Sequence, residues 1–252
     1  TPTIYVGLQL ILPGEVAPAH RHTPTAVRFV IEGEGGYTTV NGEKCPMHKG
    51  DLILTPALNW HEHGHEGSGP VIWMDALDLP MIYAMEASYA IEGPSQPVRP
   101  EADASQNKYR RAGLLPYASL GRAQRADYPQ IRYPWVDVRQ ALAALATVTP
   151  KDEAVQLAYV NPETGRPCLP TLGFSAMQLR AGQDLALRKR SASGVIHVIE
   201  GRGESEIDGV TLQWTEGDTL TIPTHAQVRH RAMGNDAYLF HVDDAPMQRA
   251  LG

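Results

Sequence analysis

Three histidines are spaced so that they could bind one metal ion. His20 and His22 are separated by a single residue, and His61 follows farther along the chain. Residues i and i+2 of a β-strand point to the same face, so His20 and His22 could place two imidazoles side by side. Neutral imidazole is a ligand for iron, copper, nickel and zinc. We therefore expect these three histidines to form a single metal site.

The composition is that of a globular chain and excludes several classes of function. The 252 residues are 42% hydrophobic and 20% charged, which suits one large domain or two of roughly 100–150 residues. The net charge of −6 and the lack of a basic tract exclude nucleic acid as an expected partner, and no apolar stretch is long enough for a membrane-spanning helix. The two cysteines, Cys45 and Cys168, are too few for a disulfide framework and favour a reducing compartment such as the cytoplasm. The first residue is Thr1, not Met, and we expect a preceding segment to be missing.

A repeated pattern divides the chain into two similar modules. Residues Val30–Gly35 read VIEGEG, and residues Val198–Gly203 read VIEGRG. Further landmarks match at nearly the same offset: Asn41-Gly42 with Asp208-Gly209, Gly50-Asp51 with Gly217-Asp218, and Pro56 with Pro223. A repeat of this period is typical of two copies of one structural module.

Each module is predicted to consist of short β-strands. Asn-Gly and Asp-Gly favour two-residue hairpins, because both central residues must adopt positive φ. The apolar runs between glycines and prolines read as strands: Tyr37–Val40, Leu52–Leu54, Val71–Met74, Thr219–Ile222 and Tyr238–Phe240. Many short strands with Gly and Pro between them indicate a sandwich or barrel, so we predict an all-β fold.

The middle of the chain has a different pattern. Gly93–Pro100 carries three prolines and is typical of a linker, whereas Trp135–Val148 has apolar residues at helical spacing after a proline. We therefore predict an N-terminal metal-binding barrel over residues 1–92, a linker with a short helix over 93–155, and a C-terminal barrel over 156–252.

Two motifs around the histidines resemble those of the cupin family. Gly14–Gly33 contains G-x5-H-x-H followed by a glycine, and Gly50–His61 contains G-x5-P followed by a histidine. The two modules together resemble a bicupin, a pair of jelly-roll barrels. Cupins usually have a glutamate four or five residues after the second histidine, but Ala26 and Val27 stand there. A three-histidine site without a carboxylate resembles the gentisate 1,2-dioxygenase group, whose relatives cleave salicylate and 1-hydroxy-2-naphthoate.

Three neutral ligands leave the full charge of a divalent metal uncompensated and three of six coordination positions open. A 2-hydroxybenzoate could occupy two of these positions through its carboxylate and phenolate, and O₂ could occupy the third. The resemblance implies Fe(II) as cofactor. It also implies that gentisate, with O₂, is cleaved between the carbons that bear the carboxyl and hydroxyl groups, to give maleylpyruvate in aromatic catabolism.

Two further residues are candidates for binding or catalysis beside the metal. Arg28 lies an even number of residues after His22, so a regular strand would turn it toward the ligands, where its guanidinium could bind the substrate carboxylate. His63 lies two residues after His61 and could be a spare ligand. It more closely resembles the partner of the substrate hydroxyl, or general base, of the group.

Three more residues are expected near the substrate, and two histidines are not. Gln9 and Tyr5 are an even step apart, so both could point inward, and Gln9 could donate to the substrate carboxylate. Asp75 follows a predicted strand and could face the far hydroxyl of the ring. We interpret His48 and His65 as surface residues.

The second module is expected to bind no metal. Gly182 matches Gly14, and the positions of the three histidines then hold Arg188, Arg190 and Val228, while His230 matches His63. Arginine cannot bind a divalent cation. The two arginines could bind an anion, but a solvated strand end is the simpler interpretation, and a structural role is expected for this barrel.

The sequence leaves several functions open. The first is a gentisate dioxygenase, and the second is the same scaffold acting on salicylate or 1-hydroxy-2-naphthoate. A metal-binding cupin without catalytic activity is a third, and a zinc hydrolase is a fourth, since three histidines and a water can bind zinc. The resemblance also implies a homo-oligomer, commonly a tetramer.

Overall fold

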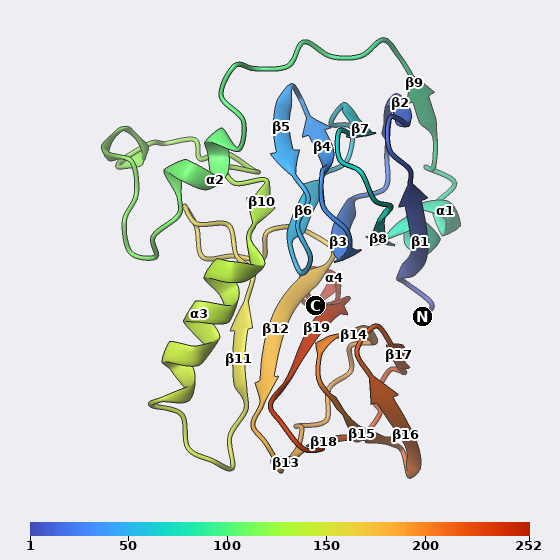
Figure 1. Cartoon of the computed structure of the whole chain (residues 1–252), viewed down its shortest axis with the longest axis vertical. Helices are drawn as coiled ribbons and strands as arrows, with labels where there is room; N and C mark the ends of the chain where they lie inside the picture. The colour runs from blue at the N-terminus through green and yellow to red at the C-terminus, as the bar shows by residue number, and fades with distance from the viewer. The chain divides into compact units, whose positions relative to one another are not determined.

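The computed structural model describes residues 1–252 and divides them into two compact units (Figure 1). The first-barrel unit comprises Tyr5–Trp135 and Val160–Leu169, and the second-barrel unit comprises Thr1–Ile4, Val136–Tyr159 and Pro170–Gly252. Each unit contains two antiparallel sheets, as the bicupin fold requires. The division at residues 92 and 155 stays a prediction, because the units exchange short segments. None of the helices is both long and apolar enough to span a membrane.

The first-barrel unit has two five-stranded sheets, with the strand orders β1-β8-β3-β6-β10 and β5-β4-β7-β2-β9. The strands are β1 (Tyr5–Ile11), β2 (Val16–His22), β3 (Ala26–Glu32), β4 (Gly36–Val40), β5 (Glu43–Pro46), β6 (Leu52–Thr55), β7 (His61–His65), β8 (Val71–Leu77), β9 (Ala90–Glu92) and β10 (Arg132–Tyr133). Three short helices accompany them: α1 (Leu79–Ala84), α2 (Ala104–Lys108) and the 3₁₀ helix η1 (Tyr117–Ser119). Both sheets contribute to one apolar core, which includes Val30, Val40 and Trp73.

The second-barrel unit repeats this architecture with the strand orders β11-β12-β19-β14-β17 and β13-β18-β15-β16. Its strands are β11 (Val155–Ala158), β12 (Gly173–Leu179), β13 (Asp184–Ala186), β14 (Gly194–Glu200), β15 (Arg202–Ile207), β16 (Val210–Thr215), β17 (Thr219–Ile222), β18 (Val228–Ala232) and β19 (Ala237–Asp243). Helix α3 (Trp135–Ala146) lies at the predicted position and ends slightly earlier than expected, and α4 (Ala245–Leu251) closes the chain.

The two predicted hairpins are present and have the same geometry. Asn41 and Gly42 have φ values of 46° and 84°, and Asp208 and Gly209 have 48° and 82°. Two consecutive residues with positive φ are characteristic of the type I′ turn that Asn-Gly and Asp-Gly favour. These turns fix the register of β4 on β5 and of β15 on β16.

The ladders of the two barrels match residue for residue at the candidate site. In the first barrel β4 pairs Val40 with His61 and Thr38 with His63. In the second barrel β15 makes the corresponding pairs, Ile207 with Val228 and Ser205 with His230. The position of His61 therefore holds Val228, as the sequence repeat indicates. The sheet around β13 has no counterpart of β9, which pairs with β2 in the first barrel.

Candidate metal centre and active site

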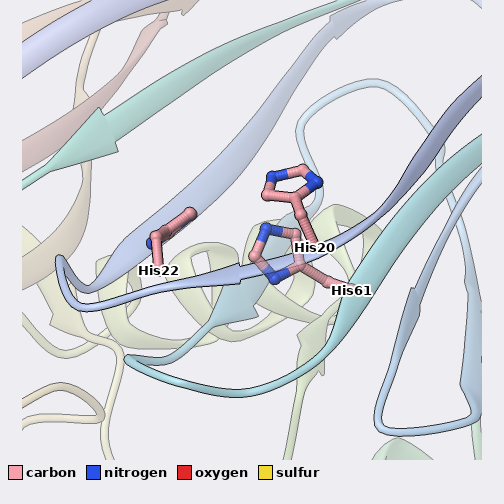
Figure 2. Close-up of side chains that lie close together, drawn as sticks. All are labelled: His20, His22 and His61. Atoms are coloured by element: carbon pink, nitrogen blue, oxygen red, sulfur yellow. The ribbon is translucent and has the colours of Figure 1, made fainter. Parts of the chain in front are cut away.

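The three candidate ligands come together on one sheet of the first barrel. His20 and His22 belong to β2, and His61 at the start of β7 lies directly opposite His20. Their ligand atoms all lie within 4.8 Å of one another, and Figure 2 shows the three rings gathered at one place. The ring centroids of His20 and His61 are 4.4 Å apart, and those of His22 and His61 are 4.9 Å apart.

Hydrogen bonds fix the tautomer of all three imidazoles. Each Nδ1 lies 2.7–2.9 Å from a backbone carbonyl oxygen, which can only accept, so Nδ1 carries the proton and Nε2 keeps its lone pair. Nε2 of His61 is buried and has no partner. Burial lowers the pKa of His22, and it lowers the pKa of His61 to about 2, so neither ring is protonated near neutral pH. Three clustered imidazoles, each with Nε2 not used in a backbone hydrogen bond, fit a divalent transition metal. The carbonyls belong to Pro18, Pro24 and Asn59.

Arg28 and Asp75 form a buried pair in the other sheet of the same barrel. They lie opposite each other in the ladder of β3 with β8, and Nε of Arg28 is 3.6 Å from Oδ1 of Asp75. Nη1 of Arg28 donates to Thr55 Oγ1 at 2.6 Å, and the Trp73 indole donates to Asp75 Oδ1 at 3.0 Å. Nε of Arg28 is buried without a hydrogen-bond partner. The site therefore contains a buried guanidinium whose hydrogen-bonding capacity is not exhausted by its bond to Thr55.

Burial shifts the pKa values of Arg28 and Asp75 more than the attraction between their charges does. Burial lowers the pKa of Arg28 although Asp75 opposes the shift, and burial raises the pKa of Asp75 although Arg28 opposes it. The positive charge of Arg28 also lowers the pKa of His22 and His61, after the larger effect of burial. Arg28 thus lies close enough to the histidine cluster for their charges to interact.

The expectation that one regular strand carries both His22 and Arg28 is wrong. β2 ends at His22, the chain turns, and β3 begins at Ala26 in the opposite sheet. Arg28 lies close to the histidines because the two sheets enclose one interior, and its position on β3 opposite Asp75 determines its direction.

His63 lies beside the cluster and is not grouped with it. Its ring centroid is 5.8 Å from that of His61 and 5.4 Å from that of Trp73, and the residue is 3% exposed. Nδ1 lies 3.0 Å from Thr38 Oγ1, and Nε2 is buried without a partner. Burial, followed by the charge of Arg28, lowers the pKa of His63 well below its usual value, so the ring is neutral.

Gln9 and Tyr5 lie at an open edge of the barrel. They belong to the edge strand β1, where Gln9 is opposite Trp73 and Tyr5 is opposite Leu77. They therefore share the sheet face of Trp73. Both residues are exposed, and no hydrogen bond joins them to Arg28. The Tyr5 ring lies over Gly7, where a Cβ atom would be 2.8 Å from the Tyr5 hydroxyl.

The interpretation of His65 as a surface residue is wrong, whereas His48 is exposed as expected. His65 is 4% exposed and holds the turn after β7: its Nδ1 accepts from the Gly67 amide at 2.8 Å, and its Nε2 bonds to the Gly69 carbonyl. Side-chain contacts of this kind with a following loop leave no periodic pattern in the sequence. Periodicity therefore could not distinguish His65 from an exposed residue.

Sequence reasoning also missed Thr38 and Thr55, which bind His63 and Arg28. The repeat contained a signal for Thr38, because Ser205 occupies its position in the second module and bonds to His230 in the same way, at 2.7 Å. A hydroxyl opposite a histidine in both modules indicates that the pair is part of the scaffold. Thr55 carried no comparable signal, because Ile222 matches it in the second barrel.

Comparisons with known proteins agree with this geometry. A model of the cupin domain matches residues 7–77. Over 252 residues the chain is 50% identical to a gentisate 1,2-dioxygenase of a Ralstonia species, covering 99% of this chain and 70% of that protein. The chain belongs to the gentisate 1,2-dioxygenase family. It is also 39% identical to the 5-aminosalicylate 1,2-dioxygenase of a Comamonas species, covering 99% of this chain and 67% of that protein. Among solved structures, the salicylate 1,2-dioxygenase of Pseudaminobacter salicylatoxidans in its gentisate adduct superposes with a TM-score of 0.91 at 33% identity, covering 99% of this chain and 70% of that one.

As a member of this family of ring-cleaving dioxygenases, the chain has a candidate metal cluster in one barrel only. In the second barrel β13 ends at Ala186, and Arg188 and Arg190 follow it as exposed residues. Val228 offers no ligand atom. Of the two barrels, only the first therefore offers a cluster that could hold a metal ion.

Proposed function

We propose that this dioxygenase uses Fe(II), held by His20, His22 and His61, to cleave gentisate between the carbons that bear its carboxyl and hydroxyl groups. The product would be maleylpyruvate, formed with one O₂ in aromatic catabolism. The observation that carries the proposal is the buried Arg28 beside three metal-directed imidazoles, because this pairing fits an anionic substrate. The names of the relatives support gentisate or a related 2-hydroxybenzoate as the substrate.

Fe(II) held by three neutral imidazoles would supply positive charge for the oxygen atoms of the substrate and the redox chemistry that O₂ requires. The protein supplies the orientation of the ligands. The carbonyl partners of the three Nδ1 atoms hold the rings and leave Nε2 as the nitrogen that would bind the metal. The low pKa of His61 keeps this ligand deprotonated in mild acid.

Arg28 would bind the carboxylate of the substrate. Thr55 holds one terminal nitrogen, while Nε has no hydrogen-bond partner of its own. Asp75 pairs with this guanidinium at 3.6 Å without a hydrogen bond, so a substrate carboxylate that makes one would stabilise it further. Charge-assisted hydrogen bonds of this kind are about twice as strong as neutral ones.

His63 would accept the proton of the substrate hydroxyl. The Thr38 hydroxyl lies 3.8 Å from Met47 Sδ, toward which it can donate, and it can then accept from Nδ1–H of His63. This arrangement leaves a lone pair on the buried Nε2, as a general base requires. The neutral state that burial imposes on His63 keeps the lone pair available at neutral pH.

Asp75, Gln9 and Tyr5 would contact other parts of the substrate. Asp75 accepts from Trp73 through Oδ1, so Oδ2 can accept from the far hydroxyl of gentisate, which salicylate lacks. Gln9 would donate to the substrate carboxylate from the edge strand β1, and Tyr5 would border the same opening. Because salicylate lacks that hydroxyl, we expect Asp75→Asn to reduce kcat/KM for gentisate more than for salicylate.

The test is O₂ uptake by protein purified without oxygen and loaded with Fe(II). We expect one O₂ consumed per gentisate, slower uptake with salicylate and 1-hydroxy-2-naphthoate, and none with protein loaded with zinc. His63→Gln should retain iron but lose most of kcat. Turnover by the zinc-loaded protein and not by the iron-loaded protein would contradict the redox proposal, and faster uptake with salicylate would move the assignment to that substrate.

We further propose a homotetramer in the cytoplasm. The exposed leucines of the edge strand β1, Leu8 and Leu10, are 67% and 55% exposed and support an interface between subunits. Cys45 and Cys168 are both free and buried, which suits a reducing compartment. Light scattering of the purified protein would test the tetramer.

A further inference from the structure

The second barrel contains a cavity where the first barrel has its metal cluster. The cavity has a volume of about 60 Å³. A single water requires about 10–15 Å³, so the cavity can hold a small molecule. Its lining includes residues at the positions of active-site residues of the first barrel: Val228 for His61, Ile222 for Thr55, His241 for Asp75, and Arg188 and Arg190 for His20 and His22.

The charge of this lining is positive. Arg190 donates to Oδ2 of Asp243 at 2.7 Å, so these two charges compensate each other. Arg188 has neither an ion-pair partner nor a hydrogen bond within the chain, and no other charged side chain lines the cavity. One cation is therefore left uncompensated at the cavity, where a small anion would neutralise it.

A histidine with unused hydrogen-bonding capacity also lines the cavity. Nε2 of His241 is buried and has no partner, and the ring is perpendicular to that of His230 at a centroid distance of 6.0 Å. Burial lowers the pKa of His241 to about 3, so the ring is neutral and carries one N–H. The ring lines the cavity, and a neutral imidazole can donate one N–H to an acceptor oxygen of a ligand.

The remaining wall is aliphatic and the rim is accessible. Leu187, Ala226 and Val242 contribute only carbon side chains, which suit the carbon part of an organic acid better than an inorganic anion. In the first barrel β9 pairs with the ligand strand β2, but no strand lies at the corresponding edge beside β13. Because β13 ends at Ala186, the segment that follows it forms an exposed rim.

We propose that the second barrel is a binding site for a small organic carboxylate. Arg188 binds the carboxylate, His241 supplies a second donor, and the aliphatic wall contacts the carbon chain. The site has no metal ligands and performs no chemistry. It does not depend on the identity of the substrate of the first barrel.

The probe is propionate, titrated into the ¹⁵N-labelled 252-residue chain at constant ionic strength. Backbone amide signals of Gly194 and Val242 report on the cavity, because both residues line it. We expect saturable shifts with propionate and none with propionamide, which has the same shape without the charge. Inorganic phosphate is the competing anion, and tighter binding of phosphate than of propionate would overturn the assignment to an organic acid.

Matched variants distinguish binding of propionate in the cavity from general electrostatic attraction to the protein surface. Arg188→Gln and Lys189→Gln remove the same charge from adjacent exposed residues, but only Arg188 lines the cavity. We expect Arg188→Gln to raise the Kd about tenfold or more, the loss of a charged hydrogen bond, and Lys189→Gln to leave it within about twofold. Ala192→Leu should abolish binding by filling the cavity while both arginines stay. Equal Kd values for the two charge variants, or unchanged binding in Ala192→Leu, would refute the proposal.

Discussion

Replacing Arg28 with alanine tests the central assignment of the active site. The side chain is 4% exposed, makes one hydrogen bond to Thr55 and pairs with Asp75 at 3.6 Å. Its removal leaves Asp75 without a cation, but burial already raises the pKa of this carboxyl, so Asp75 can become protonated and avoid a buried charge. We therefore expect Arg28→Ala to fold and to bind iron at the same occupancy as the unmodified protein.

The expected loss in Arg28→Ala is in kcat/KM for gentisate. A hydrogen bond to a charged group contributes roughly 1.5–3 kcal/mol, and about 1.4 kcal/mol corresponds to a factor of ten, so kcat/KM for gentisate should fall roughly 10–150-fold. Most of this loss should appear as a higher KM, since the carboxylate is bound in both ground and transition states. Arg28→Lys keeps the charge without the planar fork, so its kcat/KM should lie between those of the unmodified protein and Arg28→Ala.

Arg21→Ala is the matched control. Arg21 lies between His20 and His22 on the same strand, but its guanidinium stacks on Trp60 at 4.9 Å from the ring centroid. Arg21→Ala removes an arginine and its packing on Trp60, and its kcat/KM should change little. Steady-state kinetics on the folded, iron-loaded variants measures kcat/KM for Arg28→Ala and for Arg21→Ala. An unchanged kcat/KM in Arg28→Ala, or an equal loss in Arg21→Ala, would refute the assignment of Arg28 to the substrate carboxylate.

Three further predictions address the metal, an ion-pair network and the response to acid. The protein should bind one iron per chain, and the His20→Ala, His22→Ala double variant should bind none by elemental analysis; two iron ions per chain would contradict the single cluster. Arg132 bonds to Asp51 at 2.8 Å and to Asp103 at 2.6 Å, so Arg132→Ala should lower the free energy of unfolding by about 3–5 kcal/mol in urea titrations, because a buried carboxylate loses its partner. A loss below about 1 kcal/mol would show that the network contributes little. Burial lowers the pKa of His230 from 6.5 to about 4, so between these pH values the unfolded chain binds a proton that the folded chain does not. Stability should therefore fall as the pH falls through this window, by about 3 kcal/mol from this residue, and His230→Gln should show a shallower slope of unfolding free energy against pH; identical slopes would contradict the shift.

The parts of the fold that the sequence predicts well are those determined by local chemistry. Asn41-Gly42 and Asp208-Gly209 indicate their own turns, because few residues tolerate two consecutive positive φ values. The pair His20 and His22 indicates a common direction because a strand alternates its faces. These features depend on neighbours in sequence, and the structure contains both hairpins and brings the histidines together.

The parts that the sequence does not predict depend on contacts between distant residues. Arg132 bonds to Asp51, which lies 81 residues earlier in the chain, and β10, which carries Arg132, is too short to show any periodicity. The burial of His65 follows from the path of the loop at Gly67. The location of Arg28 follows from the closure of two sheets around one interior, which no spacing within a single strand encodes.

The exchange of short segments between the two units has a consequence for the evolution of the protein. Residues Val160–Leu169 belong to the first-barrel unit, although they follow helix α3 of the second. Asn161 donates to the carbonyls of Ala126 and Asp127, and the buried Glu163 accepts from the Tyr109 hydroxyl at 2.6 Å. A truncation that discards the metal-free half of the gene would therefore remove part of the metal-binding half. Substitutions can remove the metal ligands of the second barrel one at a time. Deletion of the whole second barrel is selected against, because it would also remove part of the first-barrel unit.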